Sequence, residues 1–147
     1  IRHARRRKVI TQWMAERRPD GPTLLLPTGA DANSQELIIW EGTVLTACLD
    51  GLSKHGIYNA QLLLCRGWTE STLQLQCQEG GEAYEVPLDW CQENLRHGAA
   101  ICYAAIQART IHGTCQLLDW TSPRFTRRHL VMGLSRATSI DKVWLAS

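Results

Sequence analysis

Between residues 37 and 94 the chain consists of short apolar segments separated by turn residues, and this pattern limits its middle part to a β-rich fold. In the segment 72–77, Leu73, Leu75 and Cys77 alternate with glutamines, which is the period of two of a half-buried strand. The segment 79–82 contains two glycines that permit positive φ, and it predicts a hairpin turn. Other strand-like segments are 44–48, 57–65 and 83–88. Four or five such strands predict a small barrel of SH3-like size.

The segments on either side of this middle part have a helical or α/β pattern. Val9, Ile10, Trp13 and Met14 follow helical spacing, which predicts a helix over the first 18 residues. A buried-type strand over 23–26 and a linker over 27–34 follow. Beyond residue 97 the pattern predicts an apolar stretch over 99–106, a strand over 116–118, a helix over 126–137 and a strand over 143–146. We therefore expect an α/β domain, residues 1–36 and 95–147, interrupted by a β-barrel, residues 37–94.

Charge is distributed in the same three parts. Residues 1–18 carry seven basic and one acidic side chain, a net charge of +6. Residues 19–95 carry two basic and eleven acidic side chains, a net charge of −9. Residues 96–147 carry seven basic and two acidic side chains, a net charge of +5. This asymmetry indicates an acidic unit inserted into a basic one, and the basic parts are candidates for binding phosphates. The acidic insertion is better suited to a gate, a pin support or a protein contact than to gripping a nucleic-acid backbone.

Composition excludes several classes of protein. A chain of 147 residues with 44% apolar side chains can bury one core, and its net charge of +2 argues against disorder. No apolar run approaches the roughly 20 residues that cross a bilayer, so no membrane partner is expected, and the basic start lacks the apolar segment of a signal peptide. The six cysteines lack the close pairs of a zinc site, so no metal is expected. Cys48, Cys65 and Cys102 have apolar neighbours, which predicts free core thiols and an intracellular setting.

Near the C-terminus, Arg136 lies close to the end of the predicted helix over 126–137, off the face that Leu130, Leu134 and Ala137 share. An arginine held at the end of a packed helix can present its planar fork to a phosphate. The alternative is a solvated arginine beside Asp141.

Three segments together carry a family resemblance: GLSRAT at 133–138, YAAIQARTIHG at 103–113 and IRHARRRKV at 1–9. This combination resembles the C-terminal half of superfamily 1 helicases, especially the RecD/Pif-like branch. The resemblance implies the second RecA-like domain of a two-domain motor that binds ATP between its domains and acts on single-stranded DNA or RNA. In this branch an SH3-like subdomain is inserted where the β-rich middle part lies.

The resemblance implies a role for each matching residue. Arg136 corresponds to the arginine finger of motif VI, which stabilises charge on the transferring phosphoryl group of ATP. Gln107, Arg109 and Thr110 correspond to motif V, which couples the nucleotide to the single strand. His3 and Arg6 match the H-x-x-R form of motif IV, which makes Arg6, like Gln107, a candidate for contacting the nucleotide.

The sequence departs from the family pattern in motif V and in the phosphate-binding loop. Ala105 stands where serine is common, and Ala108 stands where the family has a flexible glycine. The chain contains no G-x-x-x-x-G-K-[S/T] segment, so ATP and Mg²⁺ would be held mainly by an N-terminal RecA-like domain of the same polypeptide. If the resemblance is followed, the chain starts at Ile1 inside what should be a strand, and we therefore expect a fragment of a longer polypeptide. The alternative is a degenerate remnant that keeps the fold.

Two functions from different classes therefore remain open. One is the C-terminal motor domain of an ATP-dependent helicase, and the other is a non-catalytic module that binds nucleic acid or protein on the same scaffold. In either case Trp68, at a predicted barrel turn, is the tryptophan that we expect to be exposed for stacking on a base. The basic run from Arg2 to Lys8 is either a phosphate-binding surface or a solvated helix face.

Overall fold

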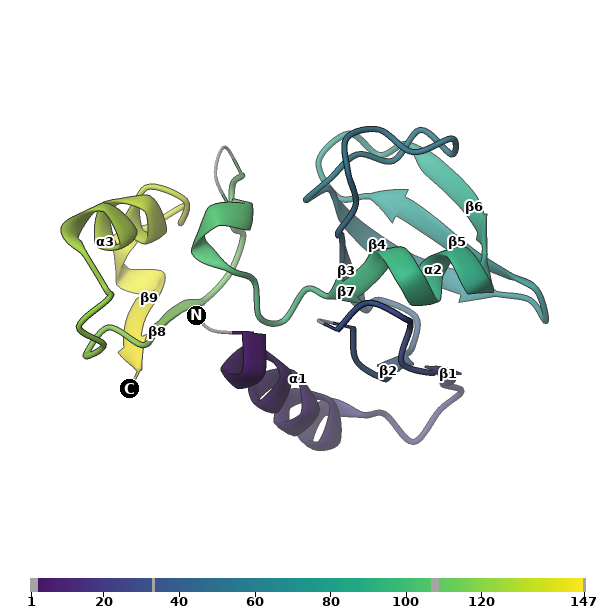
Figure 1. Ribbon diagram of the computed structural model, residues 1–147, viewed down its shortest axis with the longest axis horizontal. Coiled ribbons are helices and arrows are strands. Elements are labelled where there is room, and N and C mark those ends of the chain that lie inside the picture. Colours follow the sequence, from purple (N-terminus) through teal and green to yellow (C-terminus); the bar gives the residue numbers. More distant parts are fainter. Residues whose placement is uncertain (1–2, 33, 107–108, 147) are drawn as a thin grey trace. The chain divides into compact units, whose positions relative to one another are not determined.

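The computed structural model describes residues 3–32, 34–106 and 109–146. The chain forms two compact units, one of residues 7–100 and the other of residues 1–6 and 101–147 (Figure 1). We call them the larger and the smaller unit. Their division points lie at residues 6 and 101, and the expected division of the chain into domains 1–36 with 95–147 and 37–94 stays a prediction.

The first helix, α1, runs from His3 to Arg17, as its apolar spacing predicts. Ile10 and Met14, four residues apart on one face, are buried in the larger unit against Ala100. Val9 and Trp13 pack at the margin of the same cluster. The helix ends two residues before Pro19, whose ring cannot continue it.

The larger unit is built on a five-stranded antiparallel sheet in the order β6-β5-β4-β3-β7. Its strands are β3 (Val44–Ala47), β4 (Leu62–Trp68), β5 (Thr72–Cys77), β6 (Ala83–Pro87) and β7 (Leu95–His97). The turn between β5 and β6 confirms the predicted hairpin, because Gly81 adopts a φ of +77° and Cys77 N–H donates to the carbonyl of Glu82. A bulge between Cys65 and Gly67 breaks the β4–β5 register. The assignment of this sheet to an SH3-like barrel stays a prediction.

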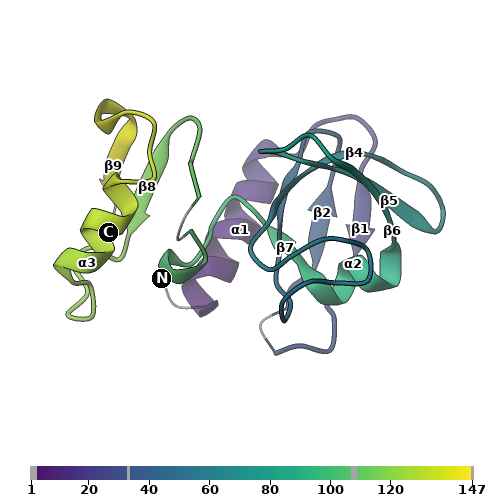
Figure 2. The same cartoon turned by 90° about the horizontal axis from the view of Figure 1, so that it is seen from above.

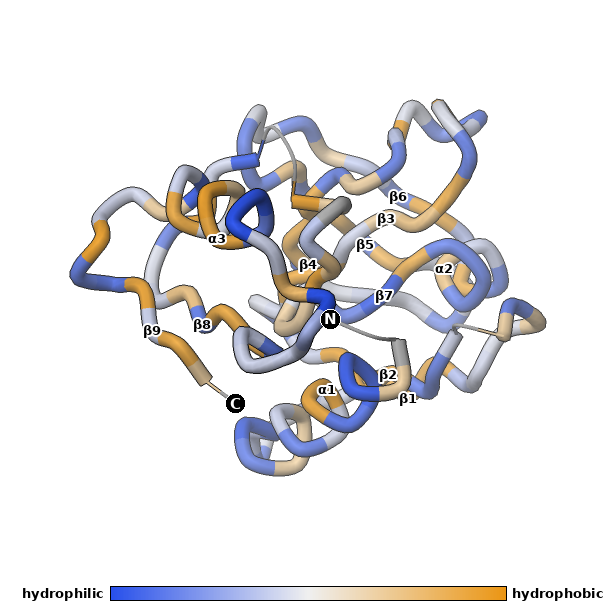
Figure 3. Tube along the Cα trace, turned by 60° about the vertical axis from the view of Figure 1, so that its left-hand side comes forward, coloured by the Kyte–Doolittle hydropathy of each residue, from blue (hydrophilic) through white to orange (hydrophobic). Residues whose placement is uncertain are grey.

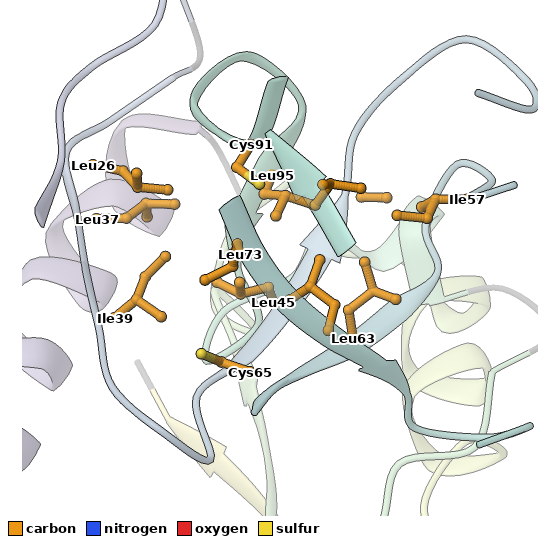
Figure 4. Packing of buried hydrophobic residues seen from close by; sticks show 13 residues of the cluster. Leu26, Leu37, Ile39, Leu45, Ile57, Leu63, Cys65, Leu73, Cys91 and Leu95 are labelled. Atoms are coloured by element: carbon orange, nitrogen blue, oxygen red, sulfur yellow. The ribbon is translucent and has the colours of Figure 1, made fainter. Parts of the chain in front are cut away.

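One face of each strand supplies the core of the larger unit (Figure 4). Leu73, Leu75 and Cys77 on β5 are buried, whereas Gln74 is exposed and Gln76 is half-buried, which is the predicted alternation. Leu45, Leu63 and Cys65 complete the central layer. Burial of each large aliphatic side chain contributes about 1.5 to 3 kcal/mol, so this cluster is the main source of stability in the unit.

A two-stranded antiparallel sheet and a short helix cover one end of this core. The strands are β1 (Leu24–Leu26) and β2 (Leu37–Ile39), and the helix is α2 (Leu88–Asn94). The loop 27–34 between the strands, predicted to be a linker, is fastened to α2. Gln92 Nε2 donates to the Thr28 carbonyl over 3.2 Å, and Ala30 N–H donates to the Glu93 carboxylate over 3.0 Å.

The smaller unit contains a β-α-β arrangement. Strand β8 (Cys115–Leu118) pairs in parallel with β9 (Val143–Ala146), and helix α3 (Arg127–Leu134) connects them together with the 3₁₀ turn η2 (Ile140–Lys142). A second 3₁₀ turn, η1 (Tyr103–Ile106), packs against α3. Figure 2 shows α3 beside the β8–β9 pair. The helix approaches closely at Gly133, where a side chain would meet Leu117 of β8.

The predicted α/β class is confirmed, with one parallel strand pair among the described residues. Strand β9 appears as a hydrophobic segment in Figure 3, and its Trp144 and Leu145 side chains are exposed. None of the described helices combines the length and hydrophobicity that crossing a membrane requires.

Candidate functional site

Arg136 lies two residues beyond the end of α3, which stops at Leu134 rather than at the predicted residue 137, and it is half-buried. At the other end of this helix, Thr126 N–H donates to Nδ1 of His129 over 3.0 Å, and the Thr126 hydroxyl lies 2.9 Å from the same nitrogen. These contacts of the His129 ring with the backbone and hydroxyl of Thr126 hold the start of the helix. Tyr103 packs edge-on against the His129 ring with a centroid distance of 5.4 Å, and burial raises the pKa of its hydroxyl to about 12. Arg136 is thus carried by a helix held at its start and against β8.

The guanidinium of Arg136 has no ion-pair partner among the residues that the structure describes. Its Nε donates to the Ser135 hydroxyl over 3.2 Å. Asp141, the carboxylate weighed as its partner, accepts a hydrogen bond from the Ser139 hydroxyl instead. That hydrogen bond holds the pKa of Asp141 below its usual value. The positive charge of Arg136 is therefore not neutralised by a carboxylate in the described part of the chain.

The structure brings the motif V segment next to Arg136. The N–H of Ile111 donates to the Arg136 carbonyl over 2.7 Å, and Ile111 forms a parallel bridge with Ala137. Thr110 is exposed and Arg109 is half-buried, and both directly precede this bridge. Gln107, the remaining candidate of this motif, lies outside the described residues, as does Ala108.

The basic segment at the start of α1 is neither a uniformly solvated face nor an open phosphate-binding one. Arg6, the second candidate for phosphate contact, is only 6% exposed. Arg5 forms an ion pair with Asp119 over 2.5 Å, and Arg7 Nη1 donates to the Ala32 carbonyl over 2.8 Å. Lys8 is exposed. The side chain of His3, the first residue of the motif IV match, lies outside the described ones.

The prediction that Trp68 is the exposed tryptophan is wrong. Trp68 ends β4 and packs against the main core, because the bulge at Gly67 interrupts the alternation that would turn the chain outward there. Trp120 and Trp144, both expected in the core, are 45% and 60% exposed. Trp68 was chosen for base stacking because it was expected to be exposed, and the structure does not show that exposure.

Sequence reasoning missed a cluster of aromatic rings in the larger unit. Trp13 and Trp40 stack with a centroid distance of 5.5 Å and an interplanar angle of 7°, and the His97 ring lies 4.7 Å from that of Trp13. Burial lowers the pKa of His97 to about 4. The cluster joins residues from three distant parts of the chain, and the local sequence pattern carries no signal for such a contact.

All six cysteines are free, as expected, and four of them are buried. The expectation that Cys48 is a core thiol is wrong, because this residue follows the last position of β3 and is exposed. Cys65 is fully buried and Cys102 is half-buried. Within the described residues no group of three or more histidine, cysteine or acidic side chains is placed to hold a metal ion.

The comparisons with known proteins find structural likeness alone. No protein-family model matches the chain, and no curated protein matches its sequence. Among solved structures, a Pif1 helicase from a study of two coordinating Pif1 helicases at forked double-stranded DNA superposes with a TM-score of 0.68 at 14% identity, covering 96% of this chain and 37% of that one. The fold of this chain is therefore similar to that of part of a Pif1 helicase.

Two further Pif1 structures, both from Bacteroides, agree with this likeness. One, bound to single-stranded DNA, has a TM-score of 0.67 at 14% identity, and the alignment covers 99% of this chain and 39% of that chain. The other, in complex with ADP-AlF3 and single-stranded DNA, has a TM-score of 0.65 with the same identity and coverage. The chain therefore spans about two-fifths of the length of the Pif1 chains that it matches.

Proposed function

We propose that this chain is the C-terminal motor domain of an ATP-dependent superfamily 1 helicase of the RecD/Pif-like branch, acting on single-stranded nucleic acid. In this proposal Arg136 is the arginine finger, and Gln107, Arg109 and Thr110 sense the strand. The single observation that carries the proposal is the Arg136 guanidinium, which has no carboxylate partner in the described chain and is joined through its backbone to the motif V segment.

The fold likeness supports the proposal. The matched Pif1 structures include a complex with single-stranded DNA and a complex with ADP-AlF3 and single-stranded DNA. The proposal also includes the inserted β-rich segment, which we take to be an SH3-like subdomain. Residues 19–95, which include this segment, carry a net charge of −9, which suits a gate, a pin support or a protein contact.

The described part of this chain contains no P-loop cradle for the phosphates of ATP. The sequence lacks the lysine and glycines of a P-loop, and in the loop 27–34 the Ala30 N–H is already bound to the Glu93 carboxylate. Backbone N–H groups in that state do not receive a phosphate. Among the described residues, Arg136 fits the nucleotide as a cationic donor to phosphate oxygens. ATP and Mg²⁺ would be bound mainly by an N-terminal RecA-like domain of the same polypeptide, in an intracellular setting.

The first test is the coding sequence upstream of Ile1. A G-x-x-x-x-G-K-[S/T] segment in the same reading frame supports the motor, whereas a frame that opens at or just before Ile1 favours a non-catalytic binding module. In a polypeptide with both halves, Arg136→Gln is expected to lower ATP turnover by about 10³-fold or more while ATP binding is kept. Arg124→Gln, which removes an exposed positive charge from the same unit, is the matched control. Equal turnover in the two variants would contradict the finger role.

The second test uses the 147-residue chain itself and a fluorescent oligothymidylate. We expect binding that weakens as salt rises, because each neutralised phosphate releases counterions. Arg109→Gln and Thr110→Ala are expected to weaken the affinity more than Arg124→Gln does. Absence of salt-sensitive binding would remove the nucleic-acid part of the proposal.

A further inference from the structure

The arrangement around Arg136 indicates how its guanidinium is held. Arg136 Nε donates to the Ser135 hydroxyl over 3.2 Å, and the same hydroxyl donates to the Met132 carbonyl over 3.1 Å. A serine hydroxyl has one proton, so its donation to Met132 turns the lone pairs toward Arg136. With Nε engaged in this way, the two Nη groups remain for the oxygens of a ligand such as a phosphate.

The backbone of Arg136 is held from the opposite side. Its N–H donates to the Gly133 carbonyl over 3.3 Å, and its carbonyl accepts from Ile111 N–H over 2.7 Å. The N–H of Ile111 belongs to the same rigid peptide plane as the carbonyl of Thr110. A rotation of that plane, such as a ligand at Thr110 would cause, therefore acts directly on the hydrogen bond to Arg136.

We infer that Ser135 and the Ile111 N–H are positioning groups for Arg136, and that the Ile111–Arg136 hydrogen bond transmits strand binding at residues 109–110 to the guanidinium. This inference rests on the proposed function, because it takes 109–110 as the strand-sensing segment. The inference adds a physical connection between the strand-sensing residues 109–110 and Arg136. This connection consists of the peptide plane that joins Thr110 to Ile111 and the hydrogen bond from Ile111 to Arg136. All of these residues lie in the smaller unit.

The experiment is nuclear magnetic resonance on the isotope-labelled 147-residue chain, with an unlabelled oligothymidylate of about twelve nucleotides as the probe. In the wild-type chain we expect the probe to shift the Arg136 Nε–H signal. Ile111→Pro removes the N–H donor and is expected to abolish this shift at probe concentrations that saturate the variant. Ile111→Val keeps the donor and is expected to keep the shift.

A second measurement needs no variant. The scalar coupling between Ile111 ¹⁵N and the Arg136 carbonyl ¹³C reports their hydrogen bond directly, and we expect it to change when the probe binds. Ser135→Ala is expected to speed the exchange of the Arg136 Nε proton with water by about tenfold, and Ser135→Thr to restore it.

The outcomes separate the inference from the proposed function. If the probe binds but the coupling does not change, or the Arg136 shift persists in a folded Ile111→Pro variant, the transmission route is wrong and the proposed function stands. If Ser135→Ala leaves the exchange of the Nε proton unchanged, the positioning role of Ser135 is wrong. If the probe does not bind the wild-type chain, strand sensing fails, and the route fails with it.

Discussion

The Arg96 guanidinium donates from Nη2 to the Asp31 carboxylate over 2.8 Å, and the two side chains are 2% and 42% exposed. Nη1 of the same arginine donates to the carbonyls of Glu93 and Leu95, each over 2.8 Å. One buried side chain thus connects the loop 27–34, the end of α2 and the start of β7. The loop that sequence reasoning treated as a linker is part of the fold of the larger unit.

Asp31→Ala is expected to destabilise the chain by about 1 to 3 kcal/mol, because it removes the only carboxylate paired with the buried Arg96 in the described chain. The partial exposure of Asp31 keeps the loss below that of a fully buried pair. Urea denaturation followed by tryptophan fluorescence measures it. Asp50→Ala, at an exposed position, is the control and is expected to be near neutral. Equal stabilities of the two variants would show that the pair does not fasten the loop.

Stability is expected to fall as the pH is lowered from about 6.5 to about 4, because burial lowers the pKa of His97 from 6.5 to about 4. In this range the unfolded histidine takes up a proton and the folded one does not, so acid favours unfolding. The full contribution of this group is about 3 kcal/mol, and it adds no slope well above pH 7. Urea unfolding across this pH range measures the effect.

The matched variants distinguish His97 from other titrating groups. His97→Phe keeps a ring beside Trp13 and cannot titrate, so its stability is expected to vary less between pH 4 and 6.5. His112→Gln changes an exposed histidine and is expected to keep the wild-type slope. The same slope in His97→Phe and the wild type would contradict the assignment.

Sequence reasoning was most successful where the physics is local. The helical spacing of Ile10 and Met14, the alternation along β5 and the turn at Gly81 depend on neighbours within a few residues, and the structure contains all three. Helix α2 was missed because its seven residues are too few for a helical period to stand out from the strands around it. Motif matching placed Arg109, Thr110 and Arg136 in one unit, and the Ile111–Arg136 hydrogen bond joins their segments.

The missed features depend on contacts between distant parts of the chain. Nothing in the sequence near Arg6 distinguishes a buried arginine from the solvated or phosphate-binding one that was expected. The stacking of Trp13 on Trp40 and the pairing of Arg96 with Asp31 are likewise set by tertiary packing. Residue type and periodicity therefore predicted elements and candidate residues, while burial decided which candidates are accessible.

Cys48 is expected to be the first thiol to react with iodoacetamide in the native chain, because it is exposed. Burial raises the pKa of Cys91 to about 12 and also raises that of Cys65, so neither supplies thiolate near neutral pH. Their alkylation is expected to be at least about a hundredfold slower until urea unfolds the chain. Peptide mass spectrometry over time measures each site, and Cys48→Ser should remove the fast phase. Rapid native labelling of Cys91 would contradict the packing of the core.

Gly133→Ala is expected to destabilise the chain although alanine favours helices. A Cβ at this position would lie 2.5 Å from Cδ2 and 3.3 Å from Cγ of Leu117, which is 2% exposed and has little room to move. Overpacking costs about 1 to 3 kcal/mol and the gain in helix propensity is about 1 kcal/mol, so we expect a net loss of up to about 2 kcal/mol.

A double-mutant cycle tests the origin of this loss. Leu117→Val has no Cδ atoms and so removes both methyl groups nearest to the added Cβ, so Gly133→Ala combined with Leu117→Val is expected to be more stable than the sum of the two single effects predicts. Val131→Ala, at an exposed position of α3, is the helix control and is expected to be near neutral in urea denaturation. If Gly133→Ala instead stabilises the chain by the full helix-propensity gain, α3 does not approach β8 at Gly133. The packing that holds the helix preceding Arg136 would then lie elsewhere.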